Sequence, residues 1–132
     1  MNNKQESLYQ ALGKSCLEHH VDICDDHQLQ ARAAFMFKEN FPGFSGHFPG
    51  QPVLPAIVQL GMVRYLTECV LGGSLLPVRY ERTKFRAMIQ PDEKVLVDIN
   101  FTKKEDNWSG SFVIQKIDKE QVATGSSEFS LQ

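Results

Sequence analysis

The feature that most constrains this chain is a run of mostly apolar residues from Val53 to Leu71. A helix drawn through this run is apolar on most faces, which is typical of a helix buried nearly all round rather than one on the surface. Pro55 fits the first turn, because the amide that proline lacks would have no partner there. Gly72-Gly73 supplies a stop. The sequence therefore predicts one long central helix.

Segments on both sides of this helix have the composition and punctuation of strands. Short polar breaks such as Asp25-Asp26-His27 separate them. Before the first strand, residues 9–18 are predicted to form a helical or irregular lead-in, and residues 1–8 to be flexible. The predicted strands lie at about 19–24, 28–38, 78–88, 93–102, 109–117 and 121–131.

One long buried helix combined with five or six antiparallel strands predicts an α+β protein. The economical arrangement is a curved antiparallel sheet wrapped around the helix, which is the hotdog fold. A chain of 132 residues suits one domain of this kind and leaves little room for two. We therefore expect a single hotdog domain over residues 1–132.

Composition excludes several function classes. The net charge of -2 provides no whole-protein attraction to nucleic acid or to an anionic membrane. No apolar run approaches the roughly 18 to 20 residues that span a bilayer, and the first residues lack the apolar segment of a secretory signal. Cys16, Cys24 and Cys69 show no paired spacing, so we interpret them as buried, reduced thiols of a cytoplasmic protein.

His47 is the strongest candidate for chemistry, because it lies in a rigid loop that runs directly into the predicted helix. Residues 40–52 hold three prolines and three glycines, which exclude helix and strand. The unpaired amides at a helix N-terminus can hold the oxygen of a thioester carbonyl as charge develops on it. The histidine can then remove a proton from the neighbouring carbon. These are the requirements for β-elimination of water from a 3-hydroxyacyl thioester.

The loop and the start of the helix read Phe44-Ser45-Gly46-His47-Phe48-Pro49-Gly50-Gln51-Pro52-Val53-Leu54-Pro55. This segment resembles the motif of bacterial 3-hydroxyacyl acyl-carrier-protein dehydratases of the FabZ and FabA type. Residues 83–92 are similar to the second block of that family, and the resemblance covers about residues 19–132. It implies that a (3R)-3-hydroxyacyl thioester is converted to the trans-2-enoyl thioester, with His47 as the catalytic base and the Ala56 amide polarising the thioester carbonyl.

The sequence departs from the resembled family at one position of the helix. The family pairs its histidine with a carboxylate fourteen residues later, and that acid helps the hydroxyl leave as water. Here the position holds Gly61, which has no side chain to donate a proton. Ala56 replaces a glycine of the family but keeps the backbone amide. The residues predicted to bind substrate are Phe48, Gly50, Pro55, Ala56, Gln59, Gly61 and Phe85.

Gly61 leaves three outcomes open. In the first, a substitute group supplies the proton: Glu68 shares the helix face but lies about 10 Å further along, whereas Gln59 and Arg64 lie near the right level. Either of those two can orient a water or the hydroxyl, or can instead make polar contacts across a dimer interface. In the second, His47 performs both proton transfers with help from water. In the third, the chain is a catalytically silent partner subunit that binds acyl chains or stabilises a related dehydratase. A hotdog thioesterase is a further alternative.

Residues 52–60, Pro-Val-Leu-Pro-Ala-Ile-Val-Gln-Leu, look more like the dehydratases of aryl-polyene clusters than like housekeeping FabZ. That resemblance implies an aromatic or polyene chain held on an acyl-carrier protein. We expect no cofactor. We also expect no metal ion, because His19, His20 and His27 lack the spacing of metal ligands.

Arg82, Lys84 and Arg86 alternate along one predicted strand and should therefore share a face. Such a face either steers an acidic acyl-carrier protein toward the site or is an ordinary solvated surface. Phe85 should point the other way, into the core or a tunnel wall.

An exposed sheet edge and an apolar helix in a small domain both require a partner. We expect a homodimer or higher even oligomer, or a heterodimer with a related hotdog subunit. In the resembled family each active site takes its histidine from one chain and its acid from the other.

Overall fold

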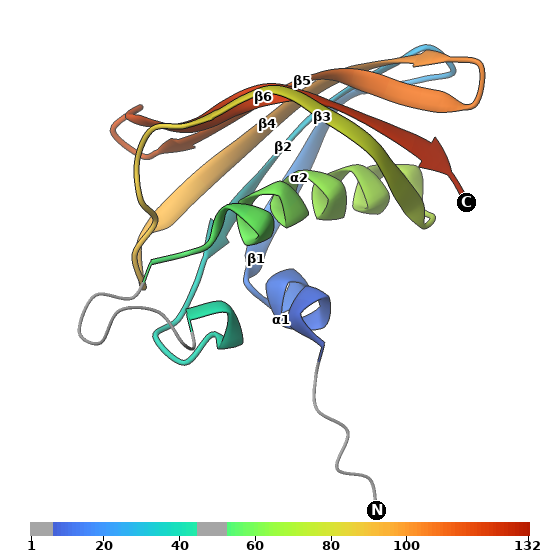
Figure 1. The fold of residues 1–132 in the computed structure, drawn as a ribbon. Helices are drawn as coiled ribbons and strands as arrows, with labels where there is room; N and C mark the ends of the chain where they lie inside the picture. The colour runs from blue at the N-terminus through green and yellow to red at the C-terminus, as the bar shows by residue number, and fades with distance from the viewer. Residues whose placement is uncertain (1–6, 45–52) are drawn as a thin grey trace, which may run out of the picture.

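The computed structural model describes residues 7–44 and 53–132 and shows an antiparallel sheet that curves over a long helix (Figure 1). The six strands are arranged in the order β1-β2-β4-β5-β6-β3, so β1 and β3 form the two edges. The elements are α1 (Leu8–Lys14), β1 (Cys16–Cys24), β2 (Gln28–Met36), the 3-10 turn η1 (Pro42–Phe44), α2 (Ala56–Leu71), β3 (Leu75–Phe85), β4 (Lys94–Lys104), β5 (Asn107–Lys116) and β6 (Gln121–Leu131). The predicted α+β hotdog fold is confirmed.

The core lies between the concave face of the sheet and one side of α2. Along β4, every second residue from Val95 to Phe101 is buried, as the two-residue period of a strand requires. On the helix, Met62 and Val63 are buried, as are Val58 and Leu66 one turn to either side. This packing fixes the direction of α2 beneath the sheet and therefore the place where the helix begins.

α2 begins at Ala56, one residue after the proline that was expected in its first turn. Pro55 has extended backbone angles (φ -63°, ψ 153°) and precedes the helix. The helix ends at Gly72, whose φ of 76° is in the left-handed region that favours glycine. The prediction of burial nearly all round is wrong for this chain alone, because Ile57, on the side away from the sheet, is 72% exposed.

The lead-in before β1 is more regular than the sequence indicated. Ser7 and Gln10 form a capping box: the Ser7 hydroxyl accepts from the Gln10 amide, and the Gln10 side chain accepts from the Ser7 amide, both at 3.0 Å. The flexibility expected for residues 1–8 stays a prediction, and residues 1–6 lie outside the described residues. In Figure 1, α2 lies between the sheet and α1.

A bulge interrupts β3 where the basic residues lie. Glu81 pairs with Ser126 and Lys84 pairs with Thr124, so Arg82 and Thr83 together face Gly125. Arg82 accordingly has a φ of 53°. The prediction that Arg82, Lys84 and Arg86 share one face by alternation is therefore wrong. β3 also ends at Phe85, before Arg86 is reached.

The cysteine prediction needs a correction as well. All three thiols are free, but Cys24 is exposed and Cys16 and Cys69 are only half-buried. The extra exposure arises because β1, which carries Cys16 and Cys24, is an edge strand. Within residues 7–44 and 53–132, no helix has the length and apolar character needed to cross a membrane. The cytoplasmic location stays a prediction.

Candidate functional site

A cavity of about 670 Å³ opens at the amino-terminal end of α2. The Leu54 amide donates to the Ile89 carbonyl oxygen at 3.1 Å, which ties the segment before the helix to the segment after β3. Because of this bond, residues from two distant parts of the sequence meet around one space. The lining includes Pro55, Ala56, Gln59, Phe85, Arg86 and Met88. Four of the seven predicted substrate-binding residues are thus brought together.

The start of α2 presents backbone amides to this region. Pro55 contributes no side-chain cap, and its carbonyl accepts from the amides of Val58 and Gln59 at 3.0 and 3.2 Å. The amides of Ala56 and Ile57 come before these and have no acceptor within the helix. No acidic residue occupies the first turn. The end of the helix is therefore suited to hold an oxygen that carries developing negative charge.

Gln59 is the polar side chain of the cavity that lies deepest in the protein. It is 3% exposed, on the side of α2 that faces the sheet, and its Oε1 atom is buried without a hydrogen-bond partner. The alternative that placed Gln59 in a contact across a dimer interface does not fit this burial within one chain. Arg64, on the other side of the helix, remains accessible to such a contact.

The walls and rim of the cavity come from the end of β3 and the turn between β5 and β6. Phe85 is 44% exposed and lines the space, so the core alternative for it is wrong and the wall alternative agrees with the structure. Met88 adds a second apolar wall. Arg86 lies at the cavity, whereas Arg82 and Lys84 are exposed on β3 and do not line it.

Lys116 and Glu120 also line the cavity, and sequence reasoning did not find them. The Lys116 ammonium lies 3.0 Å from Glu93 and 3.6 Å from Glu120, and its hydrogen bond to Glu93 is the main reason that its pKa is raised. No signal in the sequence pointed to the turn between β5 and β6. Met88 could have been predicted as a site residue, because it lies in the segment similar to the family's second block.

Gly61 lies on the opposite side of the helix from Gln59. It lines a separate groove of about 290 Å³, together with Tyr9, Leu12 and Tyr80. A Cβ atom added at Gly61 would lie 3.1 Å from the Leu12 Cδ1 atom, so α1 already occupies part of the space that a side chain there would need. Within the described chain, the position of the missing acid and the cavity at the start of α2 are therefore on different faces.

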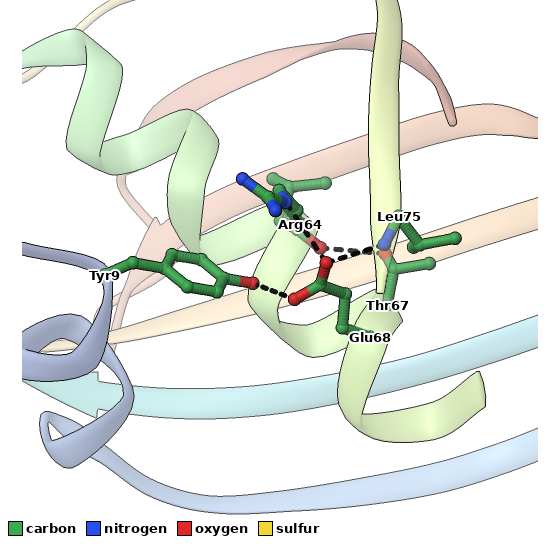
Figure 2. Close-up of polar contacts among 6 residues, drawn as sticks. Tyr9, Arg64, Thr67, Glu68 and Leu75 are labelled. Atoms are coloured by element: carbon green, nitrogen blue, oxygen red, sulfur yellow. Dashed lines mark hydrogen bonds and ion pairs between the residues drawn. The ribbon is translucent and has the colours of Figure 1, made fainter. Parts of the chain in front are cut away.

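Glu68 is fully engaged near the other end of α2, as Figure 2 shows. The Tyr9 hydroxyl donates to Glu68 Oε1 at 2.5 Å, and the Leu75 amide and Arg64 Nε donate to Oε2 at 2.8 and 3.2 Å. The Arg64 guanidinium also lies 4.7 Å from the centre of the Tyr9 ring. Since both oxygens hold α1 and β3 against the helix, Glu68 is poorly suited to replace the missing acid.

Three predicted site residues, His47, Phe48 and Gly50, lie outside the described residues. Among the residues that are described, no group of three histidine, cysteine or acidic side chains could hold a metal ion. The described residues at the start of α2 provide unpaired helix amides, apolar walls, the buried side chain of Gln59 and the cations Arg86 and Lys116.

Comparison with known proteins adds the family. The model of the ApeI-like family, described as ApeI dehydratase, matches residues 22–126. A 3-hydroxyacyl acyl-carrier-protein dehydratase FabZ of Oenococcus oeni is 24% identical over 111 residues, which cover 79% of this chain and 78% of that protein.

Two solved structures illustrate the fold. A chain of the dehydratase heterocomplex ApeI:P from Xenorhabdus doucetiae superimposes with a TM-score of 0.70 at 22% identity, covering 87% of this chain and 96% of the other. A hypothetical thioesterase from Streptococcus pneumoniae, solved with coenzyme A, has a TM-score of 0.63 at 5% identity, covering 95% and 94%. At these identities the structural matches establish the shared fold and nothing more.

Proposed function

Because this chain belongs to the ApeI-like dehydratase family, we propose that it removes water from a (3R)-3-hydroxyacyl thioester to give the trans-2-enoyl thioester. The observation that carries the proposal is the cavity at the start of α2, which follows the His47 loop directly in the sequence. The cavity combines unpaired helix amides with apolar walls. A thioester needs the first for its carbonyl oxygen and the second for its acyl chain.

The proposed chemistry assigns one role to each group. The Ala56 amide holds the thioester oxygen, and His47 removes a proton from the carbon next to the carbonyl. The double bond forms between this carbon and the next as the carbon–oxygen bond breaks, and the imidazolium returns its proton to the departing hydroxyl, so that water leaves. Phe48, Gly50, Pro55 and Phe85 are proposed to contact the substrate. Gly61 lines the groove on the other side of α2 and takes no part in this scheme. This scheme needs no carboxylate at position 61.

We further propose that the substrate is carried by an acyl-carrier protein and has an aromatic or polyene chain. Arg86 lines the cavity and is proposed to meet an acidic carrier there, and Lys84 and Arg82, which are exposed on β3 outside the cavity, are proposed as further contacts with that carrier. Elimination joins an aryl or polyene chain to the carbonyl in one conjugated system, which stabilises the product and eases a reaction that lacks the family's acid.

An oligomer is part of the proposal, either a homodimer or higher even oligomer or a heterodimer with a related hotdog subunit. Among the described strands, β1 and β3 each have an edge without a neighbouring strand. Leu76 and Val78 on β3 are exposed, as is Ile57 on α2. The related Xenorhabdus protein was solved as a heterocomplex. Burial of this apolar surface would stabilise an assembly.

The test is to incubate the purified protein with 3-hydroxyacyl thioesters of an acyl-carrier protein and to follow the carrier by mass spectrometry. We expect loss of water from the acyl group with wild type and none with His47→Ala, whose fold is checked by circular dichroism. Release of free acid would instead identify a thioesterase. Equal background conversion by the two proteins, with both saturated and aryl-polyene chains, would reject the proposal.

A silent partner subunit is the second candidate, and the packing at Gly61 favours it. Leu12 fills space next to the position where the family has its acid, so this chain alone cannot easily regain that group. Co-purification with a homologue that carries the acid distinguishes the two. A silent subunit predicts that the homologue alone removes water and that this activity survives His47→Ala in this chain. Loss of activity from the complex in His47→Ala would instead identify a site that takes its histidine from this chain and its acid from the homologue.

A further inference from the structure

The burial of the Gln59 side chain is energetically unfavourable in the protein without a ligand. Its Oε1 atom is inaccessible to water and has no hydrogen-bond partner. No hydrogen bond of the Gln59 side chain is present within residues 7–44 and 53–132, so exchanging the two amide atoms would leave the Nε2 atom in the buried position without a partner. A buried amide left without a partner is costly, so such groups in native proteins call for an explanation.

A second buried polar residue on α2 shows the usual solution. Thr67 is as deeply buried as Gln59 and also lies on the side of the helix that faces the sheet, but its hydroxyl donates to the Val63 carbonyl at 2.8 Å. Thr67 therefore has a partner within the helix, whereas the Gln59 Oε1 atom has none in the part of the chain that the structure describes. The difference in position is that Gln59 lines the cavity, whereas Thr67 does not.

The spacing between Gln59 and the start of the helix matches the proposed substrate. Ala56 and Gln59 are three residues apart, which is a rise of about 4.5 Å along a helix. In a 3-hydroxyacyl thioester the hydroxyl-bearing carbon lies two bonds from the carbonyl carbon. A hydroxyl on a thioester whose carbonyl oxygen is held at the Ala56 amide is therefore within about one helical turn of that amide, and the Gln59 side chain lines the same cavity.

We propose that Gln59 is a positioning residue that hydrogen-bonds the 3-hydroxyl group of the substrate and so selects hydroxylated over unhydroxylated acyl chains. This inference rests on the proposed dehydratase function and deepens it. An amide has no proton to give up, so Gln59 does not replace the missing acid. It holds the hydroxyl in place while His47 remains the proposed base and proton donor, so the atom balance of the elimination is unchanged.

The first measurement needs no activity. Gln59→Met keeps the size of the side chain and removes the orphan amide, so the melting temperature of the free protein should rise by about 2–4 °C. Thr67→Val, the matched control, loses a satisfied hydrogen bond and should melt lower by a similar amount. If Gln59→Met instead melts lower, as Thr67→Val does, its amide has a partner within the protein and the proposal is overturned.

The second measurement is binding in the His47→Ala background, where the substrate is not consumed. Calorimetry would compare a 3-hydroxyacyl pantetheine with the same compound lacking the hydroxyl, for saturated and aryl-polyene chains. We expect the parent to prefer the hydroxylated compound about tenfold and Gln59→Met to lose that preference while binding the unhydroxylated one equally well. Gln59→Leu repeats the test if the methionine variant is poorly folded.

The outcomes separate this inference from the proposed function. If wild type does not release water but Gln59 controls the preferred binding of the hydroxylated compound, the proposed dehydration is wrong and the inference about Gln59 stands. If wild type releases water while Gln59→Met and Gln59→Leu keep the preference, the reaction stands and the inference fails. Equal binding of both compounds by the parent, or binding of neither, overturns it as well.

Discussion

The polar side chains packed at the two ends of α2 differ in whether they have hydrogen-bond partners. Near the carboxyl end, Glu68 accepts hydrogen bonds from Tyr9, Arg64 and the Leu75 amide, and each of these bonds joins the helix to itself or to a neighbouring element. Near the amino end, Gln59 is at least as deeply buried and lines the cavity, and its Oε1 atom has no hydrogen-bond partner among the described residues. The fold thus provides partners at one end, and the proposal assigns the substrate to the other.

This contrast separates stability from function within one helix. Satisfied buried networks make a fold rigid, whereas an unsatisfied group costs stability and is kept where a ligand completes it. The carboxyl end is therefore the place where substitutions should change the free energy of unfolding. The amino end is the place where they should change chemistry.

The largest expected effect on stability comes from Glu68→Ala. This change leaves the Arg64 cation and the Leu75 amide without their acceptor in a half-buried setting, so we expect a loss of about 3 kcal/mol in the free energy of unfolding. Urea denaturation measures it. Glu81→Ala, at an exposed ion pair with Arg79, is the control and should change stability by less than about 1 kcal/mol. Equal effects of the two changes would show that the cluster does not stabilise the fold.

A smaller effect is expected from Tyr9→Phe, which removes one hydroxyl and keeps the ring under Arg64. The lost hydrogen bond to Glu68 should reduce the free energy of unfolding by about 1 kcal/mol. The same urea experiment measures it, at neutral pH. An unchanged transition midpoint would mean that α1 is held by packing alone.

The pH dependence of this variant tests the same contact. Burial, followed by the hydrogen bond to Glu68, raises the pKa of Tyr9 well above its ordinary value of 10.0. A pKa that is raised on folding contributes stability below the unfolded value, and that stability is lost as the pH rises beyond it. The stability gap between wild type and Tyr9→Phe should therefore be constant below pH 10 and narrow above it. If the difference in the free energy of unfolding between the two proteins instead increases above pH 10, the burial of the Tyr9 hydroxyl is contradicted.

The smallest effect is expected at Gly61, which lies between the two ends. Gly61→Ala gains about 1 kcal/mol of helix propensity, and the close approach of its Cβ to Leu12 offsets much of that gain. We predict a net change in the free energy of unfolding of less than about 1 kcal/mol. Gly61→Ala combined with Leu12→Ala is the control, because it removes the close contact. A large loss in the single variant that the double variant relieves would show that Leu12 cannot move.

Much of the fold could be predicted from the sequence, because periodicity and turn residues are local signals. The apolar run from Val53 to Leu71 identified α2 to within three residues, and the meander after it was also correct in outline. The capping box of Ser7 and Gln10 was a readable signal for α1 that was not used. The bulge at Arg82 and Thr83 had no such signal, since it depends on how β3 meets Gly125 of another strand.

The residue types of the candidate site could be predicted from the sequence, but the contacts of these residues could not. Pro55, Ala56, Gln59 and Phe85 could be chosen because a motif and a helix start bring them together. The sequence showed that Gln59 is polar within an apolar helix, but not that its amide lacks a partner. From the sequence, Glu68 could be considered a substitute for the missing acid. Spacing along the helix does not show that Glu68 accepts a hydrogen bond from Tyr9, which is 59 residues away.

The most direct test compares the rate of water loss from a 3-hydroxyacyl carrier-protein thioester for wild type, Gln59→Met and Glu68→Ala, at a temperature where all three are folded. We predict that Glu68→Ala keeps the wild-type rate despite its lower stability. Gln59→Met should lose about tenfold or more while melting at a higher temperature. A full rate in Gln59→Met, or a lost rate in folded Glu68→Ala, would contradict the placement of the site at the amino end of α2.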